Sequence, residues 1–88
     1  MNAVQMAAKF YEARDSCRSL FGAKWQSEQL PKWRGHIEAA MRKHDCDELK
    51  ATMHIMKGLQ ADVPGSGMAQ MCILGAAAEM MEPEGGGS

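Results

Sequence analysis

Residues 68–81 read MAQMCILGAAAEMM, and this stretch decides the fold. Only Gln70 and Glu79 in it are strongly polar. On a helix that turns about 100° per residue, the apolar side chains point in every direction, so the helix must be buried on all sides. At about 1.5 Å per residue it spans about 21 Å, which is too short for a bilayer core of about 30 Å. Protein must therefore cover it, either the rest of this chain or a partner.

The first helix is predicted from about residue 3 to Gly22, because glycine suits the left-handed position after a helix. Pro31 suits the first turn of a second helix, which ends near His44, and residues 23–30 are expected to form a loop. Asp45 has the spacing of a cap for a third helix that ends near Gln60.

Ser66 can cap the fourth helix, which ends before Pro83. We therefore expect an all-α fold: a compact four-helix domain over residues 1–82 with a hydrophobic C-terminal helix. The tail at 83–88 is expected to be flexible, and its final GGGS has the composition of an artificial linker. The residues predicted to be almost fully buried are Met6, Phe10, Cys17, Met53, Met56, Cys72 and Leu74.

The net charge of −1 is unevenly placed along the chain. Residues 1–44 hold eight Lys/Arg and four Asp/Glu, whereas residues 45–88 hold two and seven. Such asymmetry is typical of a solvated dipole, and also of a chain that orients on a charged partner or on its own copy.

The basic stretch at residues 24–43 holds five Lys/Arg against two Glu, with tryptophans between them. Trp33 lies on the apolar side of the second helix, but Trp25 falls in the expected loop and is predicted to be an exposed anchor. The stretch fits an acidic protein or, less well at a pI near 6.3, a nucleic acid. The candidate partner-binding residues are Lys24, Trp25, Lys32, Arg34, Arg42 and Lys43.

The fourth helix offers a second candidate surface. Its centre, residues 75–78, is Gly-Ala-Ala-Ala, so another backbone could approach closely there. Two alternatives could bury the fourth helix: the three other helices of the chain, or a second copy of the chain across a two-fold axis. We expect a homodimer, and the candidate self-association residues are Met68, Met71, Gly75, Ala78, Met80 and Met81.

The sequence carries no nucleotide loop, no paired-cysteine metal signature and no nucleophile motif, so we expect no enzyme activity, no cofactor and no metal site. His44, Cys46 and His54 do not have the spacing of zinc ligands. Three widely spaced cysteines without a secretory leader indicate free thiols in the cytoplasm.

We therefore expect a non-enzymatic helical module for protein–protein interaction, an inhibitor or adaptor that binds a larger protein complex, without a membrane segment. Its size and composition are compatible with phage-encoded inhibitors of host defence complexes such as CRISPR complexes, although no residue carries that match. The alternative is a nucleic-acid-associated regulator that uses the basic stretch at residues 24–43.

Overall fold

Four α-helices account for most of residues 3–62 and 65–81, the part of the chain that this computed structural model describes. They are α1 (Ala3–Phe21), α2 (Leu30–His44), α3 (Glu48–Asp62) and α4 (Gly67–Met81), and a π-helical turn, η1 (Trp25–Gln29), precedes α2. The predicted all-α four-helix fold is confirmed. Over these residues, no helix combines the length and the apolar character needed to cross a membrane. The tail predicted to be flexible, 83–88, lies outside the described residues.

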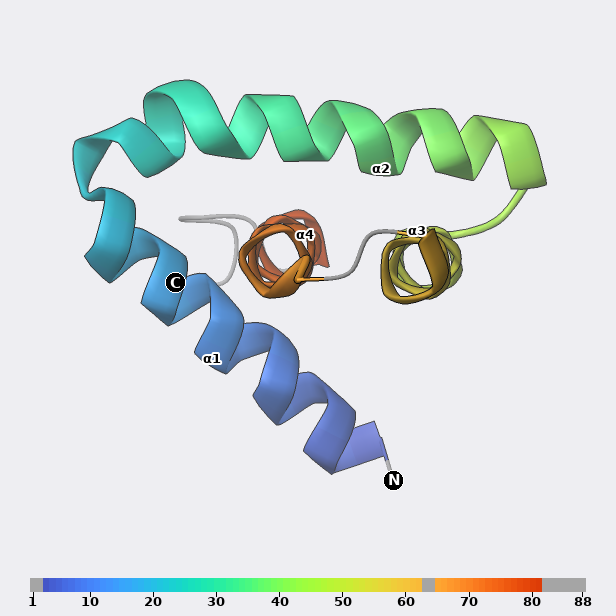
Figure 1. The fold of residues 1–88 in the computed structure, drawn as a ribbon, viewed down its shortest axis with the longest axis horizontal. Helices are drawn as coiled ribbons and strands as arrows, with labels where there is room; N and C mark the ends of the chain where they lie inside the picture. The colour runs from blue at the N-terminus through green and yellow to red at the C-terminus, as the bar shows by residue number, and fades with distance from the viewer. Residues whose placement is uncertain (1–2, 63–64, 82–88) are drawn as a thin grey trace.

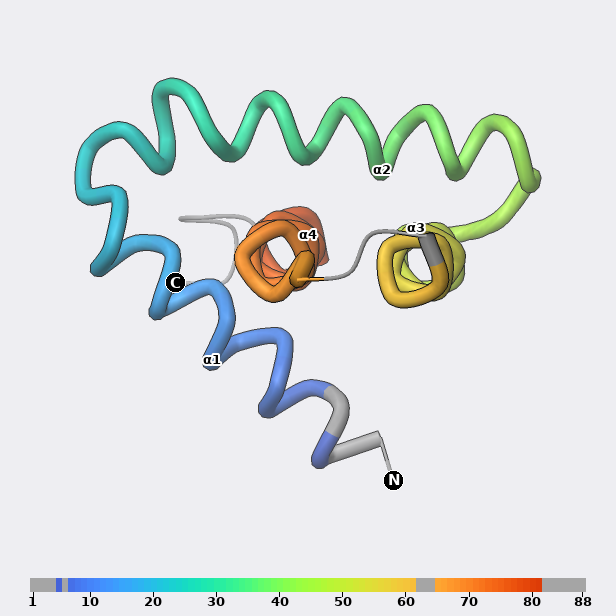
Figure 2. Tube along the Cα trace, in the orientation of Figure 1, coloured from blue at the N-terminus to red at the C-terminus, as the bar shows by residue number. Residues whose placement is uncertain are grey.

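The last helix lies at the centre of the molecule. Figure 1 shows α2 lying across the fold, with α3 and α4 seen nearly end-on beneath it and α1 running obliquely past α4. The tube in Figure 2 shows that the chain turns from α1 into α2 at one end of the fold and from α2 towards α3 at the other. Because α4 contacts α1, α2 and α3, it forms the hub on which the other helices pack.

The other three helices cover the centre of α4. Its side chains at Ile73, Ala76, Ala77 and Ala78 have no exposed surface, and Cys72 is 1% exposed. The prediction that this helix is buried on all sides is confirmed for its centre, where the covering comes from within the same chain, but not for its ends, where Met68 is 55% exposed and Met81 is 36% exposed.

The small residues of α4 allow α1 to approach closely. A Cβ atom added at Gly75 would lie 3.0 Å from the Cys17 sulfur and 3.3 Å from the Ala13 carbonyl oxygen. The prediction that Gly75 and Ala78 face a second copy of the chain is therefore wrong, because α1 occupies the space beside Gly75 and Ala78 is fully buried.

Positive φ angles mark two of the helix ends. Gly22 has a φ of 58°, and its N–H donates to the carbonyl of Arg18, which ends α1 where the sequence predicts. Asp45 has a φ of 51° and its N–H donates to the Met41 carbonyl, so it closes α2. The prediction that Asp45 caps α3 is therefore wrong. Asp47 does this instead, since its carboxylate accepts the N–H of Lys50 at 2.9 Å.

The predicted core is confirmed in part. Phe10, Cys17 and Cys72 are at most 3% exposed, but Met53 is 49% exposed and was wrongly placed in the core. Met56 and Leu74 are only partly buried, which falls short of the near-complete burial predicted, and the Met6 side chain lies outside the described residues.

Met53 was misplaced because the side of α3 that faces the core differs from the side that the sequence predicts. The fully buried residues of α3 are Ala51 and Thr52, not the larger methionine that follows them. The Thr52 hydroxyl donates to the Glu48 carbonyl at 2.7 Å, so its polar atom is satisfied without water. A bonded threonine and a small alanine can therefore face the core, while the longer Met53 is half exposed to solvent.

Candidate protein-interaction groove beside α2

The predicted loop at residues 23–30 is helical, and this changes the position of Trp25. The N–H of Leu30 donates to the carbonyl of Trp25, five residues earlier, which is the hydrogen-bond pattern of a π-helix. In this turn Trp25 is fully buried and its ring stacks on that of Phe21, with 6.1 Å between ring centroids. The prediction that Trp25 is an exposed anchor is therefore wrong.

A buried carboxylate fixes this turn to the rest of the fold. Glu79 of α4 accepts a hydrogen bond from Trp25 Nε1 at 2.7 Å and two from the Arg18 guanidinium, at 2.6 and 3.0 Å. The Glu79 side chain is only 4% exposed, whereas that of Arg18 is 33% exposed. Burial raises the pKa of Glu79, but the hydrogen bonds from Arg18 and Trp25 outweigh it and hold that pKa below its usual value.

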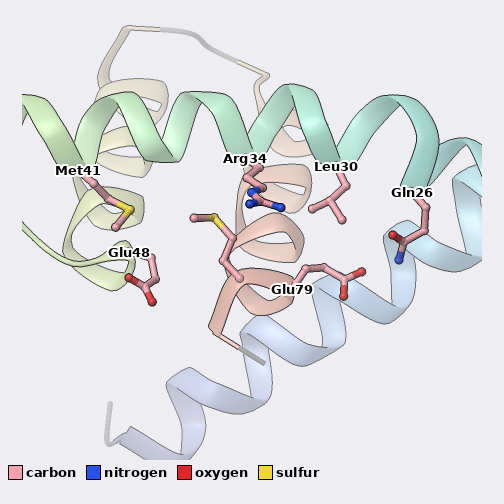
Figure 3. Close-up of a pocket in the computed structure, with 7 residues that line it drawn as sticks. Gln26, Leu30, Arg34, Met41, Glu48 and Glu79 are labelled. Carbon is pink, nitrogen blue, oxygen red and sulfur yellow. The ribbon is translucent and has the colours of Figure 1, made fainter. Parts of the chain in front are cut away.

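Glu79 also lies at the edge of an open groove, which we call the α2 groove. The α2 groove has a volume of about 460 Å³. Figure 3 shows the side chains of Leu30, Arg34 and Met41 pointing from α2 into the space that Glu48 and Glu79 border from below. The residues that line the groove are Gln26, Leu30, Arg34, Met41, Glu48, Glu79 and Met80.

The α2 groove continues along the helix rather than forming a closed pocket. A second hollow of about 360 Å³ shares Gln26, Leu30 and Arg34 with it and adds Pro31 and Glu38. Residues 26, 30, 34, 38 and 41 recur at steps of three and four, so they follow one side of the helical segment. From residue 26 to residue 41 the segment rises about 22 Å, which is the length of a helix of about four turns.

The chemistry of the α2 groove suits a peptide with one apolar side. Leu30, Met41 and Met80 are partly buried and supply apolar contact surface. Arg34 and Glu38 form an exposed ion pair at 3.6 Å on the rim. Charged groups of a partner could replace either member of this pair. Methionine side chains adapt their shape to a partner, so two of the three apolar contacts can adjust.

The predicted basic residues remain on one helical segment but do not form one site. Lys24, Lys32, Arg42 and Lys43 are exposed, and Arg34 lies on the rim of the α2 groove with its side chain 58% exposed. Lys32 and Lys43 lie on the opposite side of α2 from the buried Ile37, as the 100° rotation per residue requires. Only Arg34 of the predicted set therefore lines the groove.

The predicted self-association residues of α4 are divided by the fold. Met68 and Met81 are exposed, Met71 and Met80 are partly buried, and Gly75 and Ala78 are buried. Met80 lines the α2 groove. The structure does not bring the six together as one surface.

Sequence reasoning did not select most of the groove. Gln26, Leu30, Met41, Glu48 and Glu79 line it and were not candidates. One signal was available, because a lone glutamate in an otherwise apolar helix must find partners when that helix is buried. The other residues come from three helices, and their meeting depends on how those helices pack.

Two histidine side chains meet elsewhere, one from α2 and one from α3. The His44 and His54 rings stack with centroids 3.9 Å apart and planes 8° from parallel. Across residues 3–62 and 65–81, no group of three or more His, Cys, Asp or Glu side chains could hold a metal ion. Cys17, Cys46 and Cys72 are free thiols, and burial raises the pKa of Cys17 to about 12.

The α2 groove, together with the hydrogen bonds that join Glu79 to Arg18 and Trp25 beside it, is thus the candidate functional site in the described part of the chain. No known family, curated protein or solved structure matches this chain.

Proposed function

We propose that this chain is a non-enzymatic protein-interaction module, an adaptor or inhibitor that binds a larger protein by taking one of its helices into the α2 groove. The observation that supports this is the groove itself, which runs along η1 and α2 for about 22 Å with an apolar floor and a charged rim. Binding of an amphipathic helix in an apolar groove is a common mode of peptide recognition. An inhibitor of a multi-subunit defence complex, such as a phage-encoded one, would use the groove to occupy a surface that the complex needs.

The groove is supported from beneath by a rigid framework. Trp25, Arg18 and Glu79 connect η1, α1 and α4 through three hydrogen bonds, so the end of the groove near Gln26 is fixed before a partner arrives. A preformed site lowers the entropy lost on binding.

A single chain is sufficient for this function. The three other helices cover the centre of α4, so the surface at Gly75 and Ala78 that suggested a homodimer is already used. We propose that the module acts as a monomer in the cytoplasm, where its free thiols stay reduced.

The test uses the chain as bait in cells of its natural source, with bound proteins quantified by mass spectrometry. Met41→Asp places a charge on the groove floor, and Arg34→Glu reverses the charge of an exposed rim residue. Leu20→Asp is the matched control, because Leu20 is 58% exposed on α1 and away from the groove. Circular dichroism and thermal unfolding verify that each variant is folded.

We expect a protein partner that the unmodified chain and Leu20→Asp enrich equally and that both groove variants lose by about tenfold or more, which is a change of about 1.4 kcal/mol. Equal enrichment by all four chains, or enrichment of no protein above an empty bait, would contradict the proposed function.

The alternative of nucleic-acid binding is supported by the exposed basic residues but not by Trp25, whose ring is buried. Lys32, Arg42 and Lys43 are exposed, yet Trp25 is buried and the indole N–H of Trp33 is bonded to Gln29 at 3.2 Å. Single-stranded nucleic acids usually require exposed rings for stacking as well as charge. Fluorescence anisotropy with labelled DNA and RNA at low and moderate salt tests this alternative, which predicts an affinity that falls steeply as salt is added.

A further inference from the structure

A second surface with a different chemistry lies on the outer side of α3. Lys50, Met53, His54 and Lys57 line a shallow hollow of about 230 Å³. These residues recur at steps of three and four, so they share one side of the helix, directed away from the fully buried Thr52. We call this surface the α3 face.

The α3 face combines positive charge with an apolar centre. All four lining residues are basic or apolar, and Met53 is 49% exposed between the two lysines. Lys50 and Lys57 are two helical turns apart, which separates their positions along the axis by about 10 Å. A flexible thioether between two cations fits an apolar side chain that has an acidic residue on either side of it.

The neighbouring helix α2 fixes one edge of this surface. The His54 ring stacks on His44, with 3.9 Å between centroids, so one face of the His54 ring is already covered. The ring is then less available to stack on a nucleic-acid base, and the hollow offers a methionine where a single-strand binder usually offers an aromatic ring. These two observations favour an acidic peptide over a nucleic acid.

We propose that the α3 face binds an acidic segment of a partner protein, with carboxylates on Lys50 and Lys57 and an apolar residue between them on Met53. This site is separate from the α2 groove. Glu48, which lines the groove, lies on the other side of α3. At about 100° per residue it is roughly 160° around the helix axis from Lys50 and roughly 180° from Lys57. The two surfaces can therefore be tested one at a time.

The probe is a fluorescein-labelled helical peptide with two glutamates two turns apart and leucines midway between them. A matched peptide has glutamines in place of the glutamates, and a labelled oligo-dT strand serves as the nucleic-acid probe. Anisotropy titrations compare the unmodified chain with Lys50→Glu plus Lys57→Glu and with Met53→Ala. Lys9→Glu plus Lys32→Glu is the control, because it makes the same change in net charge at exposed residues of α1 and α2.

We expect the double α3 variant to weaken binding of the acidic peptide by at least about tenfold, since it replaces two attractions by two repulsions. Met53→Ala should weaken binding by a few fold, whereas the control variant and Arg34→Glu should change it by less than about twofold. The glutamine peptide should bind the unmodified chain about tenfold more weakly, and added salt should weaken the acidic peptide further.

Three results would overturn the proposal. They are equal loss of binding in the α3 variant and in the control, equal binding of the acidic and glutamine peptides, and tighter binding of oligo-dT than of the acidic peptide. Because all the altered side chains are exposed, unchanged thermal unfolding is expected for every variant. Failure of the α2 groove would appear only with Met41→Asp and Arg34→Glu in the partner experiment, so the two proposals fail separately.

Discussion

The two helices that flank α4 are packed in different ways. On the α1 side, Gly75 brings the backbones close together, and a buried carboxylate joins Arg18 of α1 to Glu79. On the α3 side, the inner face is Ala51 and Thr52, and the larger Met53 is left in solvent. The α1 side therefore concentrates the stabilising contacts, while the α3 side leaves longer side chains free to meet a partner.

Phe10 and Met53 give the sharpest test of this difference, because both are apolar and were predicted to be core residues. Phe10 is 3% exposed on α1, so Phe10→Ala should lower the free energy of unfolding by about 3–5 kcal/mol, enough to unfold most molecules of so small a domain. Met53→Ala should change it by less than about 0.5 kcal/mol, because the side chain is half exposed. Urea denaturation followed by circular dichroism measures both, and similar losses would show that the two sides are packed alike.

Glu79→Gln tests the buried charge on the α1 side. Removing the carboxylate should lower the free energy of unfolding by about 2–3 kcal/mol, since three hydrogen bonds to a charged group are weakened but Arg18 can still reach water. Denaturant unfolding near neutral pH measures the loss, and Glu38→Gln, at an exposed ion pair, is the control.

The same variant predicts a difference in the pH dependence of stability. The pKa of Glu79 in the folded chain lies below its ordinary value of 4.5, so the folded state binds this proton less readily than the unfolded state does. The stabilisation by Glu79 is therefore complete above about pH 4.5 and is lost as the pH falls through the folded pKa. Glu79→Gln should flatten the stability profile in that acidic range, and an unchanged slope would contradict the role of the Arg18 and Trp25 contacts.

Glycine-to-alanine substitutions measure how close the helices are on the α1 side. Gly75→Ala places a methyl group 3.0 Å from the Cys17 sulfur and 3.3 Å from backbone atoms of α1, so it should destabilise the fold by about 1–3 kcal/mol. Gly58→Ala in α3 meets nothing within 4 Å and should stabilise it by about 0.5–1 kcal/mol. Opposite signs in thermal unfolding would support the comparison, and two stabilising substitutions would refute the close approach.

The smallest effect is expected at the histidine stack between α2 and α3. Desolvation, and to a smaller extent the charges of His54 and Lys43, lowers the pKa of His44 from its ordinary value of 6.5. Because the folded pKa is lowered, the contribution to stability is complete above about pH 6.5 and is lost as the pH falls through the folded pKa. An NMR titration should show the His44 pKa rising towards its ordinary value in His54→Gln, and no change would mean that the stack does not persist in solution.

The helical pattern of the sequence was sufficient to predict the fold class, the buried last helix, and the ends at Gly22 and His44. It failed at residues 23–30 because a π-helical turn places its buried residue out of step with the 3.6-residue period. It failed at Met53 because hydrophobicity alone does not identify a threonine whose hydroxyl is satisfied by its own helix. At Thr52, a local hydrogen bond allows a polar side chain to face inward.

The candidate sites were harder to predict than the fold. Arg34 was chosen for its charge, and it does line the α2 groove, but its neighbours there come from other helices. Trp25 was chosen because tryptophan is common in interfaces, yet Glu79, 54 residues away, accepts its N–H and makes its burial favourable. A partner that distant is not visible in a local sequence pattern.

The central position of α4 has a consequence for how the protein is made in the cell. Synthesis proceeds from α1 to α4 at roughly 5–20 residues per second, so α1, α2 and α3 leave the ribosome before the helix on which all of them pack. Until α4 emerges, Cys17 lacks the helix against which it packs, because its sulfur lies beside Gly75 and its thiol donates to the Met71 carbonyl. The chain must therefore complete its fold after translation of α4, and the nascent first three helices are the stage at which chaperones or proteases would encounter it.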